Sequence, residues 1–201
     1  CTMPATAPAT ARRRPLAHRA RHVVLNARDR FLRTDSLVLA NQTPYDIVHD
    51  NGLVQLRHYR PLATDHIHVD GTDLPVASVR HRVPLLIVPP LAVNMSIYDL
   101  FPDRSLVRYF VARGFDVYLI DWGVPGLRHT HYTFETYAAH LMPEFIQAVR
   151  THSGQQDLSL HGWSLGGVLA LCYAALTHDA HIRNLVILGA PINTHASGAI
   201  G

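Results

Sequence analysis

The 201-residue chain contains 18 arginines and no lysine against 15 acidic residues, which gives a formal net charge of +3. Hydrophobic residues make up 48% of the chain and charged residues 16%, so a buried core can form and global disorder is excluded. Several of the arginines gather at residues 12–14, Arg19 and Arg21. Because the remainder is close to neutral, no nucleic-acid partner is expected.

Three further features of the sequence indicate the cellular compartment of the protein. Its two cysteines, Cys1 and Cys172, are too few for a disulfide framework. No stretch approaches the roughly 18 apolar residues of a membrane span, and the first twenty residues lack the apolar segment of a secretory signal. We therefore expect a cytoplasmic protein with no transmembrane segment.

Strand signals begin after a first region, residues 1–42, that is expected to be a flexible tail with one weakly indicated helix. Strand-like runs then occur at residues 54–60 and 76–80, and Asp70-Gly71 predicts a turn between them. The apolar run at 84–88 is followed by two prolines. It has the length of a strand that is buried on both faces, as in a parallel sheet.

Helical spacing appears next. Asp103 is expected to cap a helix that continues to Ala112 and is stopped by Gly114. Another buried strand is predicted at 116–120, followed by a turn-rich segment. A second helix is expected at 133–151, with an apolar face formed by Phe134, Tyr137, Leu141, Phe145 and Val149.

The last elements surround Gly162. A strand at 158–160 leads into this glycine, an Ala- and Leu-rich helix continues to about Leu176, and a final strand is predicted at 185–188. Strands that alternate with amphipathic helices predict an α/β fold with a mostly parallel sheet and right-handed crossovers.

The motif Gly162-Trp163-Ser164-Leu165-Gly166 follows a buried strand and opens a helix, which is the setting of a nucleophile elbow. In such an elbow the serine sits in a strained turn, and backbone passes so close to the positions two before and two after it that Gly162 and Gly166 are needed. Ser164 is therefore the predicted nucleophile. The alternative is a glycine-rich turn with an incidental serine.

An oxyanion hole needs two hydrogen-bond donors. The first is expected to be the N–H of Leu165, which directly follows the nucleophile. The second should come from the loop after the strand at 84–88. Because Pro89 and Pro90 have no N–H, the first available donors are Leu91 and Ala92, and Ala92 is preferred.

Four segments resemble polyhydroxyalkanoate synthases in order and spacing: residues 87–91, 97–100, 102–109 and 114–123. The resemblance is closest to the two-subunit class (class III) and covers about residues 43–200. It implies an α/β-hydrolase fold that transfers a 3-hydroxyacyl group from coenzyme A to a growing polyester. Acyl-CoA or an ester is then the substrate, a polyester granule surface or a partner subunit remains open, and no cofactor is implied.

Two departures from the family pattern matter. The family carries a cysteine at the position of Ser164, and a thiol with an ordinary pKa of about 8.5 forms a thiolate far more readily than serine forms an alkoxide. The family's Asp and His would follow Gly201. Residues 43–193 are thus expected to be the N-terminal part of the fold, residues 194–201 the start of a cap region, and residues 1–201 alone nearly inactive.

Other polar residues are given structural roles. Asp121 is expected to fix its loop, and His161 to support the elbow by hydrogen bonding. His66 and His68 share a strand face, but no third ligand is evident and no metal site is predicted. The residues that follow the elbow are expected to be solvated rather than catalytic: His178, Asp179, His181 and His195.

Three functions remain open at this point. The first is a synthase-type acyltransferase that works through a serine acyl-enzyme. The second is a serine ester or thioester hydrolase on the same fold, since both share the acyl-enzyme step. The third is a non-catalytic granule-associated or partner protein.

Overall fold

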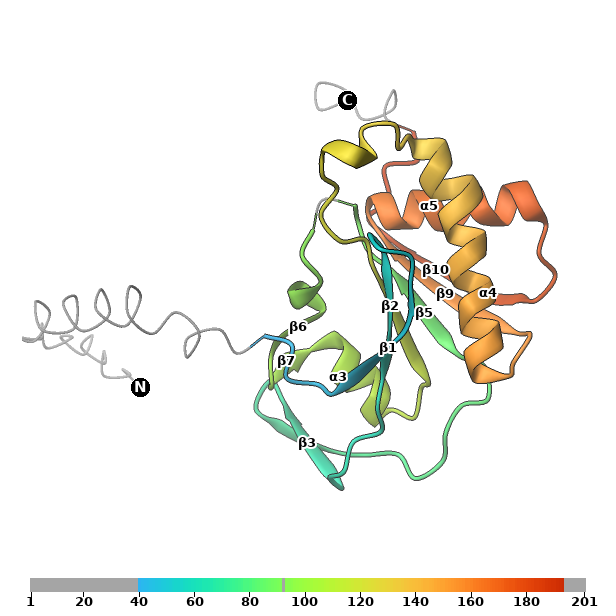
Figure 1. Cartoon of the computed structure of the whole chain (residues 1–201). Helices are drawn as coiled ribbons and strands as arrows, with labels where there is room; N and C mark the ends of the chain where they lie inside the picture. Colours follow the sequence, from blue (N-terminus) through green and yellow to red (C-terminus); the bar gives the residue numbers. More distant parts are fainter. Residues whose placement is uncertain (1–39, 92, 194–201) are drawn as a thin grey trace, which may run out of the picture. The chain divides into compact units, whose positions relative to one another are not determined.

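The computed structural model describes residues 40–91 and 93–193, and its centre is a six-stranded sheet (Figure 1). The strand order is β1-β2-β8-β5-β9-β10. Strands β8, β5, β9 and β10 run parallel to one another, whereas β2 pairs antiparallel with both β1 and β8. The mostly parallel sheet predicted from the sequence is confirmed. The strands are β1 Tyr45–Asp50, β2 Gln55–Tyr59, β5 Leu85–Val88, β8 Val117–Asp121, β9 Leu158–Trp163 and β10 Ile182–Leu188.

A separate β-hairpin precedes the segment 76–80, where a strand was expected. β3 (His66–Val69) and β4 (Thr72–Pro75) pair antiparallel around the predicted Asp70-Gly71 turn. The strand expected at 76–80 is wrong. The N–H groups of Val76 and Ala77 donate to the distant carbonyls of Asp65 and Ala112, so this segment meets no single neighbouring strand and forms no ladder. A two-stranded element, β6 (Asp99–Phe101) with β7 (Arg104–Ser105), precedes the first long helix.

Helix α3 (Leu106–Ala112) begins later than its sequence suggested. Its cap is Ser105 rather than Asp103, because the Ser105 hydroxyl accepts from the Arg108 N–H at 3.0 Å while Ser105 itself keeps extended backbone from its pairing in β7. The stop at Gly114 is confirmed, since this residue has a φ of +88° that a side chain rarely tolerates.

The second predicted helix starts with a π-helical segment, η3 (Thr136–Leu141), and continues as α4 (Met142–Ser153). Four of the five residues on its predicted apolar face are buried, but Phe134 is 43% exposed. Phe134 lies two residues before η3, at the amino end of this helical stretch, and it belongs to neither buried cluster of the described residues.

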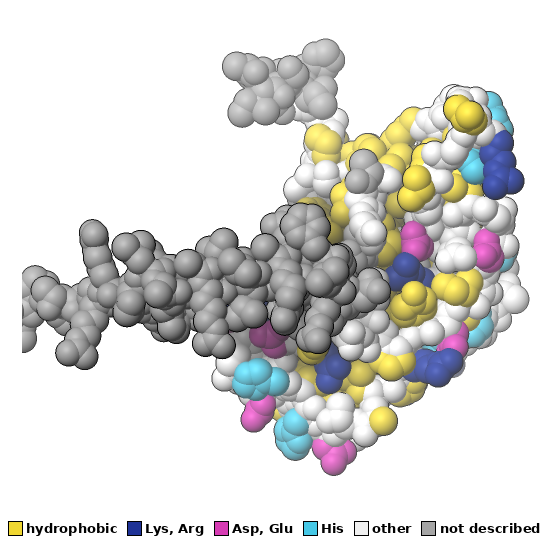
Figure 2. Space-filling model, turned by 60° about the vertical axis from the view of Figure 1, so that its left-hand side comes forward, with side chains coloured by type: hydrophobic (Ala, Val, Ile, Leu, Met, Phe, Trp, Pro, Cys, Tyr) yellow, Lys and Arg dark blue, Asp and Glu magenta, His cyan; other side chains and the backbone are white. Residues whose placement is uncertain are grey.

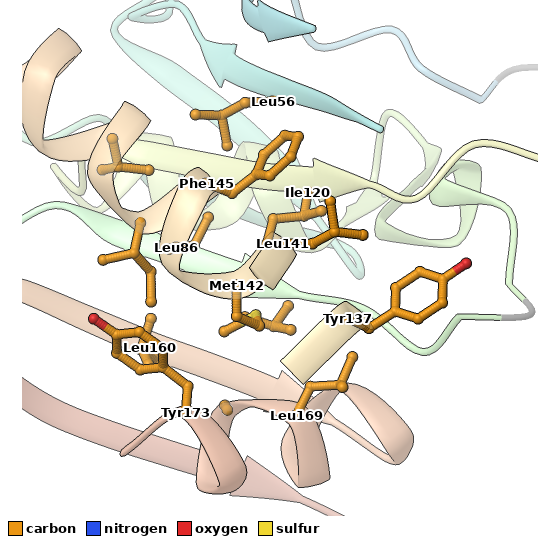
Figure 3. Packing of buried hydrophobic residues seen from close by; sticks show 14 of the residues in the cluster. Leu56, Leu86, Ile120, Tyr137, Leu141, Met142, Phe145, Leu160, Leu169 and Tyr173 are labelled. Atoms are coloured by element: carbon orange, nitrogen blue, oxygen red, sulfur yellow. The ribbon is translucent and has the colours of Figure 1, made fainter. Parts of the chain in front are cut away.

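The helices cover opposite faces of the sheet. Along β8, Tyr118 and Ile120 join the core under α4 and α5 (Leu165–Thr177), whereas Val117 and Leu119 join the core under α3. This alternation is the two-residue period of a strand. The larger cluster is drawn in Figure 3, which labels Leu56, Leu86, Ile120, Tyr137, Leu141, Met142, Phe145, Leu160, Leu169 and Tyr173. The two clusters hold the strands whose carboxyl ends carry the candidate site.

Candidate active site

Ser164 occupies the junction between β9 and α5. Its backbone has φ 52° and ψ −123°, a region that costs a non-glycine residue about 1–3 kcal/mol. The junction is anchored on its β10 side, where the Ser164 N–H donates to the Leu188 carbonyl at 2.8 Å. Because β5 and β10 flank β9 in parallel, the serine stands at the carboxyl edge of the sheet, where ligands of open α/β sheets bind.

Close packing explains the glycines around this junction. A Cβ on Gly166 would lie 2.1 Å from the Val88 carbonyl oxygen, and one on Gly162 would lie 2.5 Å from the Gly167 Cα. Both distances are shorter than any real side-chain contact. Gly167, which the sequence reading passed over, also approaches its neighbours, with Ala190 Cβ and Ile187 Cγ2 at 3.0 Å. The close packing at Gly167 could have been predicted from the Gly166-Gly167 pair in the sequence.

Of the two predicted oxyanion-hole donors, the structure describes Leu165 but not Ala92. The Leu165 N–H is the first of α5, while the Gly167 and Val168 N–H groups donate to the Ser164 carbonyl at 2.9 and 3.3 Å. Among the described residues no acceptor takes a hydrogen bond from Leu165, so this N–H is available to a developing anion at the positive end of a helix dipole. Ala92 lies outside the described residues, and its role stays a prediction.

The residue directly after β8 holds the loop that follows β5. The Trp122 indole N–H donates to the Pro89 carbonyl at 2.8 Å in a fully buried contact, which fixes the start of the predicted oxyanion loop. Asp121 pairs with Arg57 and accepts from the Gly123 N–H at 3.1 Å, so its expected role in fixing its own loop is confirmed. The sequence reading missed Trp122 and Arg57. The aromatic residue directly after a buried strand was the available signal.

The polar residues beyond α5 stand at its other end. α5 has 13 residues and is about 20 Å long, so His178 at its C-cap is remote from Ser164. His181 bonds to Asp157 through Nδ1 at 2.9 Å, next to the amino end of β9. Asp179 accepts from Arg150 at 2.7 Å and from the Tyr173 hydroxyl at 2.6 Å. All three residues are thus remote from Ser164. The expectation that they are solvated holds for the exposed His178 and His181 but is wrong for Asp179, whose side chain is only 10% exposed. His195 lies outside the described residues.

His161 differs from its expected role. It is 6% exposed, and burial lowers the pKa of its imidazole, which favours the neutral ring. Its Nδ1 has no hydrogen-bond partner among the described residues, and the ring packs against Phe110 with centroids 5.9 Å apart. The prediction that His161 supports the elbow by a hydrogen bond is thus wrong for Nδ1. The Phe110 side chain that packs against the ring has no hydrogen-bonding group.

The rest of the described surface carries mixed chemistry. Figure 2 shows charged side chains of both signs scattered among hydrophobic ones on the face that it draws.

The structure gives His68 a partner other than a metal: it bonds to Asp73 at 2.8 Å on the exposed hairpin. Within residues 40–91 and 93–193 there is no group of three or more His, Cys, Asp or Glu arranged to hold a metal ion. No helix in those ranges combines the length and apolar character needed to cross a bilayer.

Comparison with known families adds to this geometry. The model of the alpha/beta hydrolase fold family matches residues 84–199, more than half of the chain. The chain belongs to the α/β-hydrolase fold family. Among solved structures, a putative lipase from Sulfolobus solfataricus is 19% identical, with a TM-score of 0.48 over 73% of this chain and 50% of that one.

Sequence relatives are more specific. The poly(3-hydroxyalkanoate) polymerase subunit PhaC of Haloferax mediterranei is 34% identical over 167 residues, which cover 83% of this chain and 31% of the relative. The PhaC subunits of Haloarcula marismortui and Synechocystis sp. are each 32% identical and are covered to 32% and 38%. The resemblance to polyhydroxyalkanoate synthases is thus confirmed as homology to PhaC. This α/β-hydrolase-fold chain spans about a third of the length of these relatives.

Proposed function

We propose that the protein is an acyltransferase of the polyhydroxyalkanoate-synthase type, which acts on 3-hydroxyacyl-CoA through an acyl-enzyme at Ser164. The observation that carries the proposal is the strained backbone of Ser164 between a central parallel strand and a helix N-terminus. Homology to PhaC supports the choice of substrate class, because these relatives are poly(3-hydroxyalkanoate) polymerase subunits.

The chemistry follows from the atoms at the junction. The Ser164 Oγ would attack the thioester carbonyl while a base takes its proton, and the Leu165 N–H would stabilise the negative charge on the carbonyl oxygen. Collapse of this intermediate breaks the C–S bond, and coenzyme A leaves as its thiol after gaining a proton. The hydroxyl of another 3-hydroxyacyl unit then loses its proton to the base and attacks the carbonyl carbon of the serine ester. The bond from that carbon to Ser164 Oγ breaks, Oγ regains a proton, and the chain is longer by one ester bond.

A hydrolase on the same site is the second candidate, and Ser164 itself is the observation that favours it. An oxygen ester at serine is less reactive towards an alcohol than the thioester that a cysteine would form. Transfer to a hydroxyacyl group is therefore expected to be slow, and water competes unless the site excludes it. We expect the protein to release mainly free acid or short oligomers.

The nucleophile is tested by Ser164→Ala in the full-length protein. This change should abolish labelling by a serine-directed fluorophosphonate and reduce acyl-enzyme formation from 3-hydroxybutyryl-CoA by at least about a thousandfold, because the attacking oxygen is gone. Intact-mass spectrometry measures both adducts. Ser78→Ala, at an exposed serine outside the site, should leave them unchanged. Undiminished labelling of the Ser164→Ala variant would rule this residue out.

The acceptor is tested by Ser164→Cys. Released coenzyme A and product chain length are measured for both forms with 3-hydroxybutyryl-CoA. The cysteine form should shift the product towards polymer, because its thioester is the better acyl donor to an alcohol. Long polymer from the serine form would refute the hydrolytic bias, whereas free acid alone from the cysteine form would establish a hydrolase.

A further inference from the structure

A cavity of about 510 Å³ opens beside the loop that follows β5. Its wall includes Leu91 and Val93 from that loop and Val124 from the loop after β8. Arg57, Asp121 and Asn41 supply its polar side. The volume falls within the usual range for small-molecule sites, and the mixture of apolar walls with a few polar groups is typical of them.

The cavity lies at the same edge of the sheet as Ser164. β8, β5 and β9 are parallel, so their carboxyl ends share one edge. The loop that forms the cavity wall starts at Pro89, and the Pro89 carbonyl oxygen would be 2.5 Å from a Cβ on Gly166 of the elbow helix. The predicted oxyanion loop thus borders the elbow on one side and the cavity on the other.

The charges in the cavity wall cancel. Arg57 pairs with Asp121, bonds to the Asn41 side-chain oxygen at 3.3 Å and lies 4.6 Å above the Tyr45 ring. Arg57 and Asp121 are also only 11% and 21% exposed at their side chains. A paired, largely buried guanidinium offers little attraction to a phosphate or a carboxylate. The cavity therefore suits a neutral ligand.

Every side-chain acceptor oxygen in the wall already has a protein partner, whereas several side-chain N–H groups have none among the described residues. Asp121 accepts from Arg57 and from the Gly123 N–H, Asn41 accepts from Arg57, and at the rim Asn94 accepts from the Ser96 N–H at 2.9 Å. The Arg57 Nε–H is buried and does not reach the cavity, but its two terminal nitrogens and the asparagine amides carry further hydrogens that can bond to ligand oxygens. A ligand with carbonyl acceptors and no donors fits this pattern.

We propose that this cavity binds the ester-linked 3-hydroxyacyl chain, with ester carbonyls against the Arg57 side and the hydrocarbon parts against Leu91, Val93 and Val124. The identity of the ester rests on the proposed function. The pantetheine arm of coenzyme A is the competing ligand, but its amide N–H groups and hydroxyl require free acceptors. An oligoester has only acceptors between apolar carbons.

Calorimetric titration of the full-length protein tests this inference. The probe is the methyl ester of a linear, O-acetylated trimer of 3-hydroxybutyrate, which has no donors and no charge, and pantetheine is the comparison ligand. A Ser164→Ala background prevents turnover of the probe. We expect the trimer to bind and pantetheine not to bind.

Two matched variants locate the binding. Val124→Trp places an indole at the cavity wall and should raise the Kd for the trimer by at least about tenfold. Leu127→Trp, on the same loop but outside the cavity wall, should leave the Kd unchanged. Both parent side chains are exposed, at 89% and 93%, so neither change disturbs the core. Arg57→Lys should also weaken the trimer, because the planar fork of donors is lost.

Each result decides between the alternatives. No trimer binding, equal binding in the Val124→Trp variant, or pantetheine binding that Val124→Trp removes would overturn the cavity assignment. Fluorophosphonate labelling of the form that retains Ser164 reports on the nucleophile independently. Labelling without trimer binding sinks this inference alone, and Val124-dependent trimer binding without labelling supports it while removing the proposed nucleophile.

Discussion

β5 and β10 are both short apolar strands, yet they end in different environments. All four residues of β5 are buried, and none is more than 5% exposed. In β10, Val186 and Leu188 are 45% and 47% exposed. β5 lies between β8 and β9 and has helices over both faces, whereas within residues 40–91 and 93–193 β10 pairs with β9 alone and contacts α5 on one face.

The comparison shows what an apolar run does and does not specify. Hydrophobic β-branched residues favour a strand wherever it lies, but burial depends on what packs on each face. The centre of this molecule is held by apolar contacts. The region around the start of β10 is instead tied by the polar group of Arg150, Asp179 and Tyr173. Three measurements test this difference between the centre of the sheet and β10.

The largest expected difference comes from matched truncations in the two strands. Leu86→Ala removes a fully buried side chain of β5 and should lower the free energy of unfolding by about 4 kcal/mol, because a cavity remains between packed neighbours. Leu188→Ala in β10 should cost less than about 1 kcal/mol, because half of its side chain already meets solvent. Urea unfolding monitored by fluorescence gives both values. Equal losses would show that the centre and the edge are packed alike.

Adding a methyl group to neighbouring glycines of α5 probes the same contrast. Gly166→Ala meets the backbone of Val88 and Pro89, which cannot move without disturbing the central sheet, and should cost about 3 kcal/mol. Gly167→Ala meets the Ala190 Cβ and the Ile187 Cγ2 at 3.0 Å and the Gly162 carbonyl oxygen at 3.2 Å, so much smaller shifts relieve the overlap than at Gly166, where backbone oxygens lie at 2.1 and 2.5 Å. Its cost should stay within about 1 kcal/mol, since alanine also favours the helix. A larger loss from Gly167→Ala in thermal unfolding would reverse this ranking.

The smallest effect concerns the polar group near β10. Burial alone would raise the pKa of Asp179, but hydrogen bonds from Tyr173 and Arg150 outweigh it and hold that pKa below the ordinary value. Because the folded pKa is the lower one, the associated stability is present above about pH 4 and is lost as pH falls through the folded pKa.

Asp179→Asn should therefore lower stability at pH 7 by about 2 kcal/mol and flatten the acid side of the stability curve. Unfolding midpoints between pH 7 and pH 3 measure this, with Asp73→Asn on the exposed hairpin as the control. An unchanged acid slope in Asp179→Asn would mean that the group does not stabilise this region.

The prediction from sequence was strongest where short-range features decide the structure. The run at 84–88 became β5 because four consecutive apolar residues suit a strand buried on both faces. The spacing of Gly162, Ser164 and Gly166 predicted the strand–turn–helix junction, since only a few backbone torsions and one close approach determine it. Predictions with weaker local signals failed, such as the strand at 76–80 and the Asp103 cap.

The amino-acid sequence was enough to predict β2, β5, β8, β9 and β10, the family and the position of the candidate nucleophile, but not β1 or the β3–β4 hairpin. Only the folded structure revealed the order of the strands, the exposure of Phe134, and that Arg57 of β2 meets Asp121 of β8 beside a cavity. The difference comes from how far along the chain each kind of interaction acts. Torsional preferences and hydrophobic periodicity act over a few residues, whereas strand order and the pairing of residues 64 positions apart depend on how the whole core closes.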